Sequence, residues 1–139
     1  MYQNQLMKLS KDPEYRDQFG AEEARVDVRN PACGDELALA FDVEDQRILH
    51  IRHYSRACAI VFASARVLCG GTEGLTVAEA ARRVEAAMAF FEGDGDWSHD
   101  WAREEMAALG AVRAHPMRMA CVRLPWEAMR KALAQLIFA

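Results

Sequence analysis

The stretch "ELALAFDVEDQRILHIRHY", residues 36–54, decides the fold that this sequence predicts. Apolar residues alternate along its first part, which is the two-residue period of a strand with one buried face. The alternating positions are Leu37, Leu39, Phe41 and Val43. Residues 47–54 are rich in β-branched and aromatic side chains, and the polar turn between the two parts is short enough for an antiparallel hairpin. The stretch therefore predicts two paired strands.

The residues before this hairpin predict a third strand and a short helix. "ARVDVRN", residues 24–30, alternates apolar with charged residues, so three consecutive strands form a small meander. A weak helical stripe over residues 2–9 ends before Pro13, because the residue that precedes a proline is disfavoured in the helical region.

After the hairpin the period changes from that of strands to that of helices. "ACAIVFASARVLCGG", residues 57–71, predicts a mostly buried helix that ends at Gly70 and Gly71. "TVAE", residues 76–79, is a capping box that starts a second helix, which Gly93 ends. The sequence thus turns helical from Ala57 onward.

Three further helical runs complete the chain. The first covers residues 101–109 and ends at Gly110, after the loop "GDGDWSHD" at residues 93–100. Pro116 begins the second and Pro125 the third, because proline is tolerated in the first turn of a helix.

A run of strands followed by a run of helices is typical of the α+β class. We expect a small three-stranded antiparallel sheet with helices packed on one face. The 139 residues, 52% of them hydrophobic and 27% charged, fit a single domain that spans residues 1–139.

Charge and hydropathy exclude several classes of partner. The net charge is −4 with acidic and basic residues interspersed, so no long basic run is available to neutralise a phosphate backbone. No stretch of 18 or more uncharged apolar residues is present, and the first 15 residues lack the apolar core of a signal peptide. We expect a cytoplasmic protein that binds neither nucleic acid nor membrane.

A reducing compartment makes the four cysteines candidates for metal binding or catalysis rather than for disulfides. Cys33 lies in the loop between the first two strands, Cys58 at the start of the first buried helix and Cys121 inside a later helical run. Gly34 lets the chain bend so that Cys33 and Asp35 can converge. The residues alone leave open whether these cysteines share a metal site or are inert core residues.

The fourth thiol is a different case. Cys69 follows Cys58 by 11 residues, which places the two roughly 16 Å apart along a helix at ~1.5 Å per residue. Both cannot bind one ion, so we expect Cys69 to be a small buried apolar residue.

Three motifs in order resemble the iron-sulfur cluster assembly scaffolds of the NifU/IscU/SufU type. "NPACGD" at residues 30–35 is similar to that family's N-P-x-C-G-D. "CAIVFASARVL" at 58–68 resembles its C-A-I-x-x-A-S-x-S helix, and "HPMRMACVRLPWEAM" at 115–129 resembles its P-x-R-x-x-C-A-x-L-x-W-x-A-L segment. The resemblance covers residues 2–136.

The resemblance implies one shared site and a set of partners. Its site would consist of Cys33, Asp35, Cys58 and Cys121, which would hold a transient [2Fe-2S] cluster or Zn²⁺. Thiolates suit both iron-sulfur and zinc ligation, whereas a carboxylate is a harder and weaker ligand for such iron. The implied partners are a cysteine desulfurase and apo-proteins that receive the cluster.

Two functions and one structural role fit this ligand set. The first is a scaffold that assembles a cluster and transfers it. The second, implied by the SufU-type branch, is a zinc-dependent sulfur carrier, in which Cys33 is the candidate persulfide acceptor because its loop can move. The third is a closed zinc site that only stabilises the fold.

The sequence departs from the family pattern at several positions. Ala120 stands where the family often has His or Lys before the last cysteine, and Arg56 and Ala57 replace the glycines before the middle one. Arg66 replaces the second serine of the helix motif. The segment 93–114 is similar to the insertion of the SufU-type branch.

The histidines are weaker candidates than the cysteines. At most one of His50 and His53 faces any site, because strand residues alternate between faces. His115 is displaced around its helix from the last cysteine, and His99 lies between two tryptophans in a surface segment. Arg118 is a candidate functional residue, because a cation one turn from a cysteine favours the thiolate.

Overall fold

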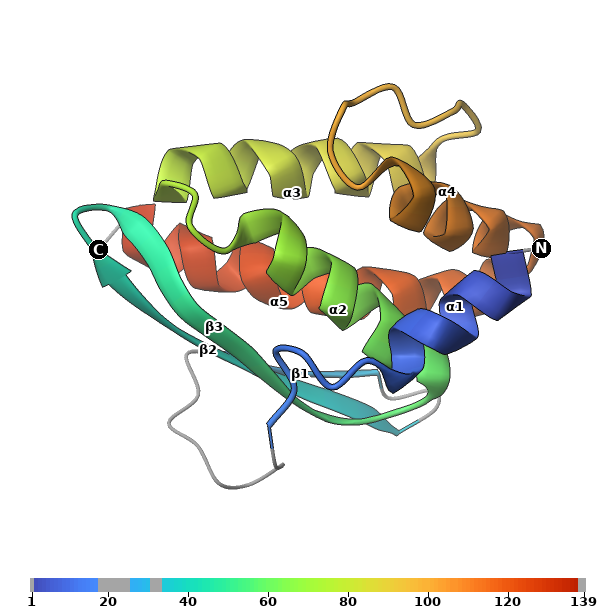
Figure 1. Cartoon of the computed structure of the whole chain (residues 1–139), viewed down its shortest axis with the longest axis horizontal. Helices are drawn as coiled ribbons and strands as arrows, with labels where there is room; N and C mark the ends of the chain where they lie inside the picture. Colours follow the sequence, from blue (N-terminus) through green and yellow to red (C-terminus); the bar gives the residue numbers. More distant parts are fainter. Residues whose placement is uncertain (1, 18–25, 31–33, 138–139) are drawn as a thin grey trace.

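The structure is a computed structural model, and it describes residues 2–17, 26–30 and 34–137. The predicted α+β class is confirmed: within these residues the chain forms an antiparallel sheet and five α-helices (Figure 1). The strands are β1 (Val26–Asn30), β2 (Asp35–Glu44) and β3 (Arg47–Arg56). The helices are α1 (Tyr2–Lys11), α2 (Ala59–Thr72), α3 (Val77–Glu92), α4 (Arg103–Ala111) and α5 (Met119–Ile137), with 3₁₀ turns η1 (Val112–Ala114) and η2 (Pro116–Arg118) before α5.

The predicted hairpin is confirmed as β2 and β3, which pair antiparallel out to Glu44 and Arg47. Its two-residue turn, Asp45 and Gln46, has φ angles of 51° and 63°. Positive φ at both central residues gives the turn the backbone twist that matches the flanking strands. β1 pairs with the other side of β2, so the strand order is β1-β2-β3.

β2 is buried on both faces rather than on the one face that alternation predicts. Its register shifts between Ala40 and Asp42, and Leu37, Leu39 and Phe41 join the main core. On the opposite face Ala38 and Ala40 form a separate buried cluster with Tyr54.

The segment after α1 runs along the free edge of β3, which the sequence did not predict. His53 N donates to Tyr15 O at 2.7 Å and Asp17 N donates to His53 O at 2.9 Å. Backbone groups of an edge strand are unpaired without such a neighbour, so this segment protects the edge.

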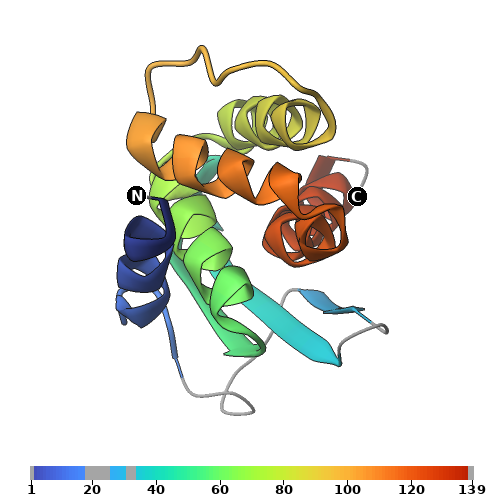
Figure 2. The same ribbon diagram turned by 90° about the vertical axis from the view of Figure 1, so that its right-hand side faces the viewer.

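The helices lie in two layers over the sheet. Figure 2 shows α2 and α5 between the sheet and the outer helices α3 and α4. The main core forms where these layers meet, and it includes Val61, Leu68, Val122 and Trp126. The capping box of α3 is confirmed, because Thr76 Oγ1 accepts from Glu79 N at 3.1 Å and the helix stops at Gly93.

Two predicted helix ends are wrong, and the three glycines concerned lie inside helices. α2 continues through Gly70 and Gly71 to Thr72, and α4 continues through Gly110 to Ala111. An added Cβ at Gly71 would lie 3.3 Å from Trp101, and one at Gly110 would lie 2.5 Å from Phe90. These glycines thus allow large side chains to approach the helix backbone closely.

The prediction of two helices at the end of the chain is also wrong. Pro116 begins only the turn η2, and α5 runs continuously through Pro125. Near this proline Ser64 Oγ donates to Val122 O at 2.6 Å and accepts from Trp126 Nε1 at 2.9 Å. Pro125 has no N–H to donate to the carbonyl of Cys121, and Ser64 bonds the next carbonyl, Val122 O, so α2 is tied to the same turn of α5.

Candidate metal centre

Three elements from distant parts of the chain end at one place. Asp35 is the first residue of β2, Cys58 is the N-cap of α2, and Cys121 lies in the first turn of α5. One ligand atom from each of these residues lies within 4.8 Å of the other two. Among the described residues this is the one such group of three or more His, Cys, Asp or Glu side chains.

The spacing of this cluster, Asp35, Cys58 and Cys121, fits a tetrahedral metal ion. Sulfur ligands lie ~2.3 Å from zinc, so two ligands of a tetrahedral ion are roughly 3.8 Å apart. The observed limit of 4.8 Å requires only small side-chain movements to reach that separation. The donor set of two sulfurs and one oxygen is also chemically suited to zinc and to iron-sulfur centres.

Asp35 connects the other two members of the cluster. Its Oδ1 accepts from Cys58 N at 3.1 Å, and its Oδ2 accepts from the Cys121 thiol at 3.6 Å. The carboxylate is buried, Cys121 is buried and Cys58 is half-buried. Asp35 therefore holds the start of α2 and the first turn of α5 beside the start of β2.

The backbone before Asp35 requires a glycine. Gly34 has φ of 74°, in the left-handed region that other residues rarely adopt. An added Cβ would meet nothing within 4 Å, so the requirement is conformational rather than steric. The predicted fourth ligand, Cys33, lies outside the described residues.

Cys69 is separate from the cluster, in agreement with the sequence analysis. It is fully buried in α2 among apolar side chains. Burial, followed by the negative charge of Glu73, raises the pKa of its thiol far above the ordinary value, because a thiolate there would lose its hydration. Cys69 is an inert core residue in this structure.

No described histidine belongs to the cluster. His53 is buried, and its Nδ1 lies 2.7 Å from Ser55 Oγ, whereas His50, His99 and His115 are exposed. Arg118 is exposed on η2.

Sequence reasoning missed an open groove of about 720 Å³ beside the cluster. It is lined by Ala59 and Ile60, which follow Cys58, by Arg118 and by residues of α1. Three large apolar side chains are exposed in the described structure, and two of them, Tyr2 and Met7, line this groove. The weak apolar stripe of α1 was the one sequence feature that pointed to it.

Fold and cluster together define a class of protein: an α+β domain that gathers two thiols and a carboxylate from the ends of three elements. Residues 1–136 match the family described as NifU-like N terminal domain, and the chain belongs to this family. Within the described residues no helix is both long and apolar enough to cross a membrane.

Two characterised relatives are about equally similar to this chain. It is 27% identical over 111 residues to the zinc-dependent sulfurtransferase SufU of Bacillus subtilis (strain 168). This alignment covers 79% of this chain and 74% of that protein. It is 26% identical over 136 residues to the iron-sulfur cluster assembly scaffold protein IscU of Streptococcus pyogenes serotype M1. This alignment covers 96% of this chain and 82% of that protein. These identities do not separate the SufU branch from the IscU branch.

A solved structure supports the fold. The N-terminal part of a nitrogen-fixing NifU-like protein from Brucella abortus superposes with a TM-score of 0.81 at 21% identity, covering 99% of this chain and 94% of that one.

Proposed function

We propose that this protein is a scaffold on which an iron-sulfur cluster is assembled and from which it is transferred to apo-proteins. The observation that carries the proposal is the convergence of Asp35, Cys58 and Cys121 within 4.8 Å. Cys33, two residues before Asp35, is the proposed fourth ligand. The cluster is the cargo of the protein rather than a permanent cofactor.

The mixed ligand set supports release as well as binding. Thiolates are the ordinary ligands of iron-sulfur clusters, and a carboxylate is a harder donor that binds such iron less firmly. The Cys121 thiol donates to Asp35 in this structure, so metal must displace a proton from the same hydrogen bond. Asp35 thus has two roles: it orients Cys121 before loading and provides the weakest bond afterwards.

A cysteine desulfurase is the proposed sulfur donor, and the groove beside the cluster is its proposed docking surface. Residues that line the groove adjoin the proposed ligands in the chain: Ala59 follows Cys58 directly, and Arg118 precedes Cys121 by three residues. Exposed Tyr2 and Met7 provide apolar contact area there. Apo-proteins that receive the cluster would have to dock on this same groove to reach the metal centre.

The alternative is a zinc-dependent sulfur carrier of the SufU branch, with Cys33 as the persulfide acceptor. The observation that favours it is the segment 93–114, which forms a long loop and α4 and resembles the insertion of the SufU-type branch. Zinc bound by the same residues would mask the thiols until the desulfurase displaces one of them. Either function fits a reducing cytoplasm, and the three described cysteines are free thiols.

Metal analysis of the purified protein separates the two functions. Iron with acid-labile sulfide and visible absorbance supports the scaffold. One tightly bound zinc ion without visible absorbance, together with stimulation of a cysteine desulfurase, supports the carrier. Protein that takes up neither metal nor cluster on reconstitution contradicts both.

Asp35→Cys tests the carboxylate itself. For a scaffold it should retain a reconstituted cluster longer and transfer it more slowly while desulfurase turnover is unchanged. For a carrier it completes a four-thiolate site, so turnover should fall. Asp100→Cys, which adds a thiol in the exposed loop before α4, is the matched control. Unchanged rates in Asp35→Cys with normal metal content would remove Asp35 from the site.

A further inference from the structure

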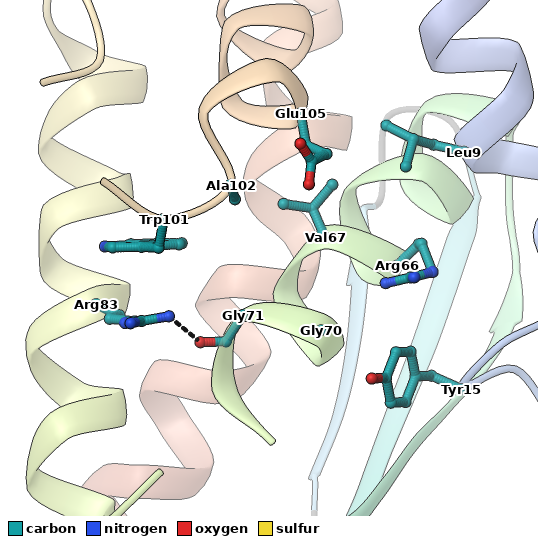
Figure 3. Close-up of a pocket in the computed structure, with 10 residues that line it drawn as sticks. All are labelled: Leu9, Tyr15, Arg66, Val67, Gly70, Gly71, Arg83, Trp101, Ala102 and Glu105. Atoms are coloured by element: carbon teal, nitrogen blue, oxygen red, sulfur yellow. Dashed lines mark hydrogen bonds between the residues drawn. The ribbon is translucent and has the colours of Figure 1, made fainter. Parts of the chain in front are cut away.

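A second cavity lies at the opposite end of α2 from the metal centre. It has a volume of about 310 Å³ and lies where α1, α2, α3 and α4 meet (Figure 3). Gly70 and Gly71 line it near the last turn of α2. They follow Cys58 by about a dozen residues, so the cavity is roughly 18 Å from the metal centre at ~1.5 Å per residue.

One of the two arginines that line this cavity is already neutralised. Arg66 Nε donates to Asp12 at 2.9 Å and its Nη2 donates to Glu14 at 3.1 Å, while its guanidinium lies 5.0 Å from the ring centre of Tyr15. These contacts anchor the segment after α1 to α2. Arg66 therefore adds little net positive charge to the cavity.

The other two charges in the cavity are not neutralised within the described structure. Arg83 stacks on Trp101 at 4.6 Å and its Nη1 donates to Gly71 O at 3.0 Å, but no described carboxylate forms an ion pair with it. The half-buried carboxylate of Glu105 likewise forms no ion pair with a described residue. The cavity thus offers one unpaired positive and one unpaired negative group.

The remaining side chains that line the cavity are apolar apart from the hydroxyl of Tyr15, and backbone groups of Gly70 and Gly71 add polar surface. Figure 3 shows the Arg83 guanidinium and the Tyr15 hydroxyl directed toward Gly70 and Gly71 from opposite sides. The side chains of Leu9, Val67 and Trp101 supply the apolar surface. The cavity surface is more polar than apolar, which suits a small charged ligand, and its volume is at the lower end of ligand cavities, which begins at ~300 Å³.

We propose that this cavity binds a small zwitterion, an α-amino acid with an aliphatic side chain. Its carboxylate would pair with Arg83 and its ammonium group with Glu105. Its side chain would contact Leu9 and Val67. A dianion such as phosphate fits poorly, because Glu105 would repel it and Arg66 is already paired with Asp12 and Glu14. This site is independent of the proposed scaffold function.

Titration of the full-length ¹⁵N-labelled protein with L-leucine tests the proposal. The indole N–H of Trp101 should shift saturably with a dissociation constant below about 1 mM, which is attainable for so small a ligand. The indole N–H of Trp126, which does not line the cavity and donates to Ser64, is the internal reference. 4-Methylpentanoate, which lacks the ammonium group, and 3-methylbutylamine, which lacks the carboxylate, should each bind at least tenfold more weakly.

Glu105→Gln should weaken leucine binding at least tenfold, and Glu104→Gln should not change it. Both glutamates lie in the first turn of α4, but Glu104 is exposed and does not line the cavity. Metal uptake should be unchanged in both variants, so this experiment is separate from the test of the scaffold. Absence of a saturable shift, equal binding of 4-methylpentanoate, or unchanged affinity in Glu105→Gln would overturn the proposal.

Discussion

The described cysteines differ in chemistry because their surroundings differ. Cys58 is a half-buried helix N-cap, and Cys121 donates to the buried carboxylate of Asp35. Each thiol thus lies beside polar groups, in surroundings where it can bind a metal ion. Cys69 is enclosed by apolar side chains, and burial raises its pKa. The reactivity of a cysteine thus depends on its hydration and on neighbouring charges.

Removal of a proposed ligand should remove most of the bound metal. Cys58→Ala and Cys121→Ala each take one thiolate from the cluster, and we expect the same of Cys33→Ala. Elemental analysis after reconstitution measures the metal per chain. A variant that retains a full complement of metal would show that its cysteine is not a ligand.

Cys69→Ser is the matched thiol control and should retain all of the metal. Its hydroxyl would be buried in an apolar environment, so we expect the free energy of unfolding to fall by ~1–3 kcal/mol. Metal content and a urea titration of the same sample measure the two effects. Loss of metal in this variant would contradict the separation of Cys69 from the cluster.

At the scale of elements, buried hydrogen bonds and close contacts fix how the helices pack. Trp126 of α5 donates to Ser64 of α2, which donates in turn to the α5 backbone at Val122. Arg113 contacts the loop between α3 and α4 and donates to the carbonyl oxygens of Phe90, Gly93, Gly95 and Gly110, and within the loop Trp97 Nε1 donates to Trp101 O. Hydrogen bonds of single side chains thus fix the positions of neighbouring helices and loops relative to one another.

Ser64→Ala should lower the free energy of unfolding by ~1–3 kcal/mol. The substitution leaves the buried indole N–H of Trp126 and the carbonyl of Val122 without their partner. Urea unfolding followed by fluorescence measures the change, and Ser98→Ala, in the exposed loop, is the control. Equal midpoints for the two variants would mean that the buried bonds contribute nothing.

Arg113→Gln should release the loop between α3 and α4. Hydrogen exchange of residues 94–102 should accelerate at least tenfold, because four carbonyl contacts to the guanidinium are lost. Arg130→Gln removes only an exposed ion pair with Glu85 and should leave this exchange unchanged. Slow exchange in Arg113→Gln would show that the aromatic contacts of Trp97 hold the loop instead.

At the scale of the whole molecule, the segment after α1, strand β3 and helix α2 enclose His53. The ring is 6.3 Å from that of Phe62, and the backbone pairs with Tyr15 and Asp17. Burial, and to a lesser extent the positive charge of Arg16, lower the pKa of His53 to about 4. The folded protein therefore keeps this imidazole neutral at a pH where an unfolded chain would protonate it.

Stability should fall on acidification because of this histidine. The unfolded chain binds a proton as the pH falls below about 6.5, whereas the folded chain does so only near pH 4. One pKa unit corresponds to about 1.4 kcal/mol. Neutral His53 therefore contributes ~3 kcal/mol to the free energy of unfolding at neutral pH, and this contribution is lost by pH 4. Urea unfolding between pH 4 and 7.5 measures it.

His53→Gln should flatten this part of the pH dependence, and His115→Gln, which changes an exposed residue, should not. Carboxylates contribute equally to the wild type and the variants, so the difference between the curves isolates His53. Parallel curves for all three proteins would contradict the lowered pKa.

The sequence by itself determined the elements whose signals are local. Alternation over residues 36–54 predicted the hairpin, because side-chain direction in a strand has a fixed period of two. Thr76 and Glu79 predicted the start of α3, because a capping box closes within one turn. Family motifs proposed Asp35, Cys58 and Cys121, which the structure places together.

Tertiary structure alone decided the features that depend on distant residues. α2 passes through Gly70 and Gly71 because other side chains pack against them, and α5 passes through Pro125 beside a hydrogen bond that Ser64 supplies. Asp35 and Cys121 are 86 residues apart, yet they share a hydrogen bond. Local patterns determine the period and ends of an element, but which side chains meet depends on how the whole chain packs.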